Sequence, residues 1–320
     1  MASARSMNLL AAMRYLVALD KHRHFGRAAQ ACHITQPALS NALRALEDEF
    51  GVAIIKRSRT YGGLTQEGEL VLDTARRALH EMDLLEQELR STAEEARGPL
   101  RMGAVPTAVP ILTVFAAMLQ RRHRGIVPTV LTLSSPEIET QLENLSLDLA
   151  LGYTERFGKQ DTRFRCWPQG QERYFLLRHQ ADNAGKALRY GPSITWADAG
   201  KFALCQLTPE MHNRTIIEAA LQSVGMPSAP SLETNSLLAI TLAVTVGEVS
   251  AILPGAMISA VREQGSLEAL PLIEPDIRTP LGFIALSDDR RSRTLQAALR
   301  LMSAPEWVEV LEKYEGEHIF

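Results

Sequence analysis

The chain has 320 residues, of which 46% are hydrophobic and 22% are charged. This length exceeds what one hydrophobic core usually organises, so two or three compact units are expected. No apolar run approaches the roughly 20 residues of a membrane helix, and residues 1–7 show no secretory leader, which predicts a cytoplasmic protein without a membrane partner. Three cysteines and eight histidines show no spacing typical of disulfides or metal sites, so no metal or cofactor is expected.

The net charge of −3 is unevenly distributed. Residues 1–62 contain nine Lys or Arg residues and four Asp or Glu residues, which leaves a net charge of −8 for the rest of the chain. A basic module on an acidic body favours a partner with a phosphate backbone. Solvated basic surfaces are common, however, and charge alone does not identify the partner.

Apolar residues at helical spacing predict three short helices, at residues 8–21, 25–32 and 35–50. A short second helix, a tight turn and a third helix with a polar N-terminal half are typical of a helix-turn-helix motif, whose recognition helix reads base edges in the major groove. A three-helix bundle without a ligand would show the same spacing. The third helix is expected to bury an apolar stripe formed by Leu39, Leu43, Leu46 and Phe50.

A short apolar run and a basic, glycine-ended loop follow in residues 52–64, and predict a two-stranded wing. Lys56, Arg57 and Arg59 are placed where they could contact phosphates beside the groove, which would add affinity and register. The alternative is a solvated basic loop.

Residues 65–97 are rich in Ala, Leu, Glu and Arg and lack proline, which predicts one long helix. Apolar residues at heptad spacing, at positions 75, 82 and 89, favour pairing with a second copy of the chain. Packing onto the same chain is the alternative. Gly98 and Pro99 end the helix and mark a domain boundary.

Strand and helix patterns alternate from residue 98 onward, which predicts two α/β units, each with a mainly parallel sheet, and a ligand cleft at their junction. The expected strands are residues 100–105, 127–133, 147–152, 172–177, 202–204, 249–253 and 281–286, and the expected helices are residues 107–122, 135–144, 214–224, 236–245 and 292–302.

These segments together resemble the LysR-type transcriptional regulators. The helix-turn-helix signature is carried by residues 25–29 (FGRAA), 34–40 (ITQPALS), 46–51 (LEDEFG) and 54–57 (IIKR), and Ile55 stands where the family usually has an aromatic residue. The effector-domain signature is carried by residues 99–103 (PLRMG), 147–151 (LDLAL) and 247–254 (GEVSAILP), and Val249 stands where glycine is common.

The resemblance implies a winged helix-turn-helix at residues 1–64, a dimerising linker helix at 65–97 and a two-subdomain effector domain, like a periplasmic binding protein, at 98–320. Subdomain I would comprise residues 98–168 and 275–320, and subdomain II residues 169–274. The family also implies a cytoplasmic homotetramer that binds promoter DNA, contacts RNA polymerase and acts more often as an activator than as a repressor.

The resemblance further assigns DNA-binding residues by their match to the family's motif. Bases would be met by Gln36, Pro37, Ser40, Asn41 and Arg44, and phosphates by Arg27, Lys56, Arg57 and Arg59.

An anionic small-molecule effector is expected where helices begin and strands end around the cleft. Thr107, Ser134 and Ser135 begin helices, whose free N–H groups favour an anion, although an ordinary cap has the same geometry. Arg156 or Arg214 could neutralise the anion or could form surface ion pairs. Residues near predicted strand ends complete the candidate set: Tyr153, Gln206, Thr208, Thr234 and Asn235.

Three alternatives remain at this stage. Cys166 or Cys205 could make the chain a redox sensor, although neither has a closely spaced partner and a buried, inert thiol is the simpler interpretation. A solute-binding protein would leave residues 1–97 unexplained. An enzyme is not expected, because no nucleophile-elbow or nucleotide-binding motif is present.

Overall fold

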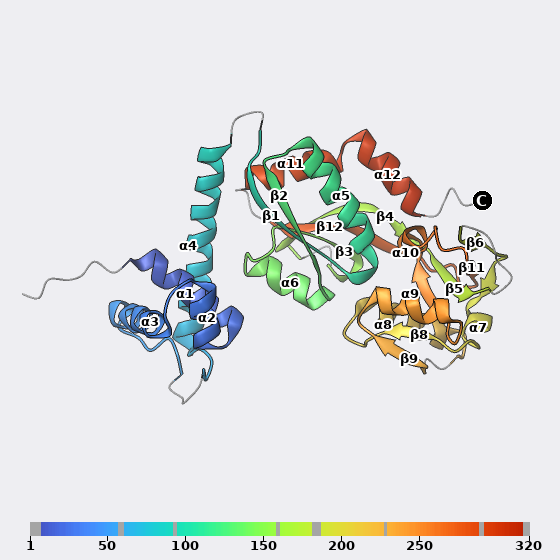
Figure 1. Ribbon diagram of the computed structural model, residues 1–320, viewed down its shortest axis with the longest axis horizontal. Coiled ribbons are helices and arrows are strands. Elements are labelled where there is room, and N and C mark those ends of the chain that lie inside the picture. The colour runs from blue at the N-terminus through green and yellow to red at the C-terminus, as the bar shows by residue number, and fades with distance from the viewer. Residues whose placement is uncertain are drawn as a thin grey trace, which may run out of the picture. The chain divides into compact units, whose positions relative to one another are not determined.

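The computed structural model describes residues 8–56, 61–91, 95–157, 161–180, 187–226, 229–287 and 291–315, with side chains up to residue 312 (Figure 1). The chain divides into two compact units, Met1–Leu89 and Arg90–Phe320. Arg57 and Arg59 lie outside the described residues.

The first unit is a helical domain with one apolar core. Its helices are α1 (Leu9–His22), α2 (Phe25–Ala31), α3 (Gln36–Phe50) and α4 (Gln66–Arg90). Leu16, Leu39 and Leu46 are completely buried between the first three helices. Asp20 joins α1 to α4 through an ion pair with Arg76, at 2.7 Å.

Helix α4 differs from the expected linker helix at its C-terminal end. It ends at Arg90, before the predicted residue 97, although the sequence beyond Arg90 contains good helix formers. Leu85 and Leu89 are exposed on its last turns, so this part of the helix carries apolar surface that its own unit does not cover. Apolar surface of this kind is what pairing with a second copy would bury.

Subdomain I of the second unit is built on a mixed five-stranded sheet in the order β2-β1-β3-β12-β4. Strand β1 is parallel to β2 and β3, whereas β12 runs antiparallel to both β3 and β4. Four of the five strands therefore run in the same direction, as a mainly parallel sheet requires, and β12, which returns from the other subdomain, is the antiparallel one. The strands are β1 (Gly98–Ala104), β2 (Ile126–Thr132), β3 (Leu149–Tyr153), β4 (Phe164–Glu172) and β12 (Thr279–Leu286).

Helices cover both faces of this sheet. Helices α5, α11 and α12 pack together on one side, and α6 packs against β3 and β12 on the other (Figure 1). On the side of α5 and α12, these helices and the sheet enclose a buried aromatic group formed by Phe115, Phe283 and Trp307. The elements are 3-10 helix η1 (Pro106–Ala108), α5 (Val109–Arg122), α6 (Ser135–Glu143), 3-10 helix η2 (Thr154–Arg156), α11 (Arg293–Met302) and α12 (Pro305–Glu315).

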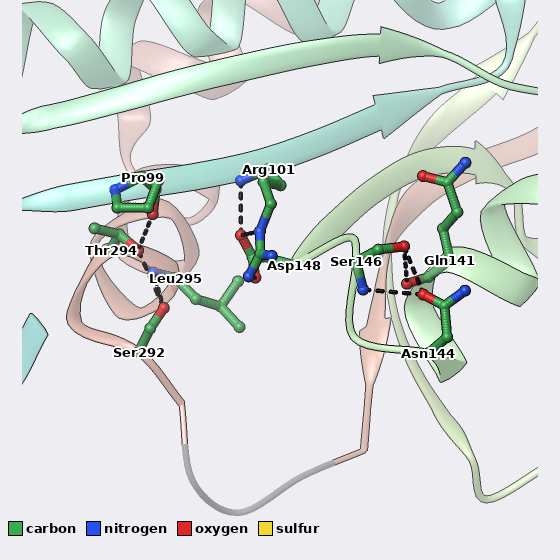
Figure 2. A network of polar contacts seen from close by, with 9 residues as sticks. All are labelled: Pro99, Arg101, Gln141, Asn144, Ser146, Asp148, Ser292, Thr294 and Leu295. Atoms are coloured by element: carbon green, nitrogen blue, oxygen red, sulfur yellow. Dashed lines mark hydrogen bonds and ion pairs between the residues drawn. The ribbon is translucent and has the colours of Figure 1, made fainter. Parts of the chain in front are cut away.

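A polar network holds the N-terminal half of β1 (Figure 2). Arg101 donates its backbone N–H to Asp148 at 2.7 Å, and its guanidinium binds the same carboxylate at 3.1 Å. On the same strand, the Pro99 carbonyl accepts a hydrogen bond from the buried Thr294 hydroxyl, at 3.1 Å. These contacts hold β1 to the segment before β3 and to the start of α11.

Subdomain II contains a second sheet in the order β10-β5-β11-β6, to which β7 adds at β11, and a separate parallel pair, β8 and β9. Strand β5 is antiparallel to both β10 and β11, whereas β6 and β7 are parallel to β11, so here too one strand runs against a mainly parallel sheet. The strands are β5 (Tyr174–His179), β6 (Arg189–Tyr190), β7 (Ile194–Thr195), β8 (Cys205–Leu207), β9 (Leu232–Thr234), β10 (Ala251–Pro254) and β11 (Leu267–Ile273), and the helices are α7 (Trp196–Ala199), α8 (His212–Ser223), α9 (Leu237–Val246) and α10 (Gly255–Ala260).

Helix α9 has an exposed apolar stripe. Leu238, Leu242 and Val246 lie four residues apart on one face and are 69%, 57% and 74% exposed. Ile240 and Val244 on the opposite face are completely buried. A helix that is apolar on both faces is expected to contact another surface.

Candidate functional sites

The turn between α2 and α3 is built by local capping. His24 caps α2, because its Nδ1 accepts the Arg27 N–H at 3.3 Å. Thr35 caps α3, because its hydroxyl accepts the Ala38 N–H at 3.3 Å, and Pro37 occupies the first turn. The buried face of α3 packs on α1 and α2, which directs its opposite face to solvent.

That outer face carries most of the residues assigned to DNA. Gln36, Pro37, Asn41 and Arg44 are exposed on α3, Ser40 is half-buried, and Arg27 is exposed on α2. Phe50, by contrast, is 42% exposed and not part of the core, because the helix ends there at Gly51 in a left-handed conformation. The exposed set is polar and basic, as a surface that meets DNA requires.

A groove joins α3 to the wing. It is lined by Ser40 and Arg44 from α3 and by Lys56 from the wing, so three of the predicted residues share one surface. Glu47 and Asp48 also line it, and the sequence had given them no role. Two carboxylates in a groove assigned to phosphates need a structural reason.

The wing is a short antiparallel pair in which Ile55 bridges Leu64. The Lys56 N–H donates to the Gly63 carbonyl at 3.0 Å. The Tyr61 ring packs edge-on to Phe25 at 6.2 Å, and burial raises the pKa of its hydroxyl. The wing is thus attached to the start of α2 as well as to α3.

In the second unit, the subdomains meet at a buried polar cluster. Thr107 and Tyr153, both predicted as effector residues, share a hydrogen bond of 2.8 Å between their hydroxyls. Asn213 on α8 donates to the same Tyr153 hydroxyl at 3.3 Å, which links subdomain II to subdomain I. Burial raises the pKa of Tyr153 well above its usual value, so the hydroxyl keeps its proton. These side chains are packed against each other, whereas the sequence predicted an open cleft.

Glu172, at the end of β4, is the member of this cluster that the sequence did not reveal. Its side chain is buried, and neither carboxylate oxygen has a hydrogen-bond partner of normal geometry among the described residues. Burial raises the pKa of Glu172 to about 8; the nearby Tyr153 hydroxyl opposes this rise, and the charge of Glu155 adds to it. The carboxyl is therefore mostly neutral at pH 7.

Ser134 and Ser135 begin α6 and differ in their contacts. The N–H and the hydroxyl of Ser134 both donate to Oε2 of Glu137, each at 2.7 Å, in a capping box at the start of the helix. The Ser135 hydroxyl is buried and has no hydrogen-bond partner among the described residues. Of the two, only Ser135 is available to a ligand.

The remaining predicted effector residues belong to subdomain II. Gln206 is buried in β8. Thr208 and Thr234 lie at the ends of β8 and β9, where the Thr208 N–H donates to the Thr234 carbonyl at 3.2 Å. Asn235 is exposed.

Both arginines considered as anion ligands are held in ion pairs. Arg214 is buried and binds Glu218 at 2.6 Å and Glu233 at 2.8 Å. Arg156 binds Glu139 at 2.8 Å. These contacts support the interpretation of both arginines as ion-pair partners and not as ligands of an anion.

The cysteines sit in environments that disfavour the thiolate. Cys166 lies on β4 and Cys205 on β8, in separate sheets, and burial raises the pKa of both thiols. Burial also raises the pKa of Cys32 at the end of α2. The described residues contain no group of three or more potential metal ligands. None of the helices in the described part of the chain combines the length and apolar character needed to cross a bilayer.

The fold and the exposed face of α3 define a DNA-binding protein with a winged helix-turn-helix and a two-subdomain α/β regulatory domain. The family models agree: residues 10–69 match "Bacterial regulatory helix-turn-helix protein, lysR family" and residues 93–304 match "LysR substrate binding domain". The chain belongs to the LysR family of transcriptional regulators, and the predicted family and fold class are confirmed.

Curated relatives are regulators too. The chain is 37% identical over 140 residues to the hydrogen peroxide-inducible genes activator of Pectobacterium carotovorum, an alignment that covers 43% of this chain and 46% of that protein. The chain thus spans about half the length of this relative. It is 28% identical over 273 residues to the DNA-binding transcriptional dual regulator OxyR of Escherichia coli K12, which covers 85% and 87% of the two chains.

Solved structures share the fold. Full-length OxyR from Pseudomonas aeruginosa superposes with a TM-score of 0.66 at 22% identity, covering 92% of this chain and 97% of that one. Full-length CbnR in complex with its target DNA superposes with a TM-score of 0.63 at 17% identity, covering 92% and 98%.

Proposed function

We propose that this regulator is an activator that binds promoter DNA through α3 and the wing, and that a small molecule bound between its two α/β subdomains controls it. The observation that carries the DNA-binding part is the exposed polar face of α3, fixed by a buried core behind it and joined by one groove to Lys56. Since the protein would act on chromosomal DNA, we place it in the cytoplasm. Its domains would follow the boundaries predicted above, except that β4 extends subdomain I to Glu172 and the linker helix α4 ends at Arg90.

We assign base contacts to Gln36, Ser40, Asn41 and Arg44, with Pro37 against the groove, and phosphate contacts to Arg27 and Lys56. Arg57 and Arg59, which lie outside the described residues, would extend the phosphate contacts. Gln and Asn suit adenine and Arg suits guanine, because each offers a bidentate pattern to that base.

The test is a gel-shift titration of the full chain on the DNA upstream of its own gene. Ser40→Ala combined with Arg44→Ala should weaken binding by about 10- to 100-fold, since a base contact contributes about 1–3 kcal/mol. Arg77→Ala is the control, because it removes one positive charge from an exposed position on α4. Equal affinities for the double variant and the control would count against this placement of the DNA.

For the effector, we propose that an anionic group binds at the start of α6, beside Ser135. The buried, unpaired hydroxyl and the N–H groups of the first helical turn are what such a group needs. Thr107, Tyr153 and Gln206 would contact the ligand. A second set would surround these contacts: Ser134, Thr208, Thr234 and Asn235. A thermal-shift screen of small carboxylic acids, with Ser135→Ala as the comparison, tests this: an acid that stabilises both proteins equally would place the ligand elsewhere.

A response to peroxide is the second candidate, because several relatives are named for induction by hydrogen peroxide. The thiol environments argue against it, since a raised pKa lowers the thiolate fraction on which oxidation depends. Mass spectrometry after brief peroxide treatment of the full chain distinguishes the candidates. Selective oxidation of Cys166 or Cys205 together with altered DNA affinity would favour the redox sensor.

We further propose self-assembly through α4 and through α9. Exposed Leu85 and Leu89 would pair two linker helices, and the stripe on α9 would join regulatory domains, which gives a dimer of dimers. Contact with RNA polymerase would follow from activation.

A further inference from the structure

Ile54, the residue that begins the wing, forms hydrogen bonds to α3 and to the residue just before α4. Its N–H donates to Oε1 of Glu47 on α3 at 2.8 Å, and the N–H of Ile55 donates to the same oxygen at 3.0 Å. The Ile54 carbonyl accepts the N–H of Thr65, the residue before α4, at 3.0 Å. One peptide segment thus connects the recognition helix to the linker helix.

The attachment to the start of α4 is close. The Thr65 hydroxyl donates to the Ala53 carbonyl at 2.6 Å and accepts the Gly68 N–H at 2.9 Å. A Cβ atom at Gly68 would lie 2.1 Å from the Ile54 carbonyl oxygen, so the helix backbone touches the wing directly. The segment has no room to slide along α4.

Glu47 is the acceptor for the N–H groups of both Ile54 and Ile55 among the described contacts. The attachment of the wing to α3 through these groups therefore depends on Glu47. Ile54 is 1% exposed, so its N–H has no access to water and needs a protein acceptor. Lys56 follows one residue after Ile55 and is held to Gly63 across the wing. The position of Lys56 relative to α3 is therefore set through Glu47.

We infer that Glu47 is a positioning residue for DNA binding: its carboxylate fixes the wing against the recognition helix, and thereby places Lys56 for its phosphate. The inference rests on the proposed function, in which the groove between α3 and the wing meets DNA. It explains why a carboxylate lies in this groove although its charge repels phosphates. Ile54 is hydrogen-bonded both to Glu47 on α3 and to Thr65 at the start of α4. A rotation of α4 would therefore move the wing relative to α3.

The sign of the effect separates placement from charge. Removing a carboxylate near phosphates should tighten DNA binding by electrostatics alone. Asp48 is the matched control, because it is the next residue of α3, is exposed and lines the same groove. Asp48→Ala should therefore bind DNA as tightly as the native protein or more tightly. Glu47→Ala should bind less tightly.

The experiment measures affinity of the full chain for a mixed-sequence duplex of about 40 base pairs over a range of salt concentrations, because wing contacts to phosphates do not depend on sequence. Glu47→Ala should bind about tenfold more weakly than the native protein and reduce the salt slope by about 1 per subunit, as Lys56→Ala should. The double variant should be no weaker than Lys56→Ala. Glu47→Gln keeps an acceptor oxygen, so its DNA affinity and its salt slope should both return to those of the native protein.

Several outcomes would overturn the inference. Glu47→Ala binding as tightly as Asp48→Ala would show that only charge matters, and additive losses in the double variant would show that Lys56 is placed independently. If Glu47→Ala does not fold, judged by circular dichroism, Glu47→Gln decides: a reduced slope in that folded variant contradicts the placement role. If Lys56→Ala and the Ser40–Arg44 variant both leave binding unchanged, the proposed DNA face itself is wrong.

Discussion

Replacing Glu172 with Gln should remove a pH dependence of stability from the regulatory domain. The folded protein holds this carboxyl at a pKa of about 8, compared with an ordinary value of 4.5. Between these two values the folded state binds more protons than the unfolded state, so the native protein loses stability as the pH rises. The loss begins above pH 4.5 and is complete near pH 8.

The magnitude follows from the difference of the two pKa values. Each pH unit inside this window lowers the free energy of unfolding by about 1.4 kcal/mol, which amounts to about 4–5 kcal/mol over the full interval from 4.5 to 8. From pH 5 to pH 7 the native protein should lose about 2–3 kcal/mol from this one group. Gln has no proton to lose, so the variant should show none of this slope.

Urea denaturation followed by tryptophan fluorescence measures the effect. Trp167, Trp196 and Trp307 all lie in the second unit, so the signal reports only that unit. Glu155 and His212, which contact each other at 3.1 Å near the cluster, are present in both proteins, so the comparison isolates the substitution. Parallel stability curves for the native protein and Glu172→Gln between pH 5 and pH 8 would refute the buried, neutral carboxyl.

Three further predictions concern the two units. Gly68→Ala should destabilise the first unit by about 1–3 kcal/mol, because its Cβ would collide with the Ile54 carbonyl at 2.1 Å, whereas exposed Glu69→Ala should have little effect in the same thermal melt. Arg214→Ala should destabilise the second unit by about 1–3 kcal/mol, since it removes a buried side chain that binds Glu218, Glu233 and the Leu207 carbonyl, and an unchanged urea midpoint would contradict this. Leu242→Glu should lower the mass measured by analytical ultracentrifugation without lowering the unfolding temperature, because the side chain is 57% exposed; an unchanged mass would exclude the α9 stripe from assembly.

The first unit was largely predictable from the sequence because its signals are local. Thr35 and Gly51 bound the recognition helix through their own caps, and the spacing of Leu39, Leu43 and Leu46 identified its buried face. The end of α4 was placed too late: the helix ends at Arg90, although the sequence that follows has helical propensity.

The second unit was less predictable because its arrangement is nonlocal. Nothing near residues 279–286 indicates that this strand inserts antiparallel between two strands more than 100 residues earlier. Glu172 escaped notice for the same reason: one acidic residue before an apolar strand looks like a surface residue, and it is buried near Tyr153, which is distant in the sequence. Glu47 matched the family's motif, but its two hydrogen bonds appear only when the wing is folded.

The strand order of subdomain I also constrains the sequence of events during synthesis. The residues of the first unit are contiguous, so it can fold as soon as they leave the ribosome. Strand β4, in contrast, has no partner on either side until β12 is made, after all of subdomain II. A chain that stops before residue 279 would retain its DNA-binding unit but expose β3 and β4 as open sheet edges, which are prone to aggregate. Nonsense mutations that remove β12 should therefore yield insoluble protein.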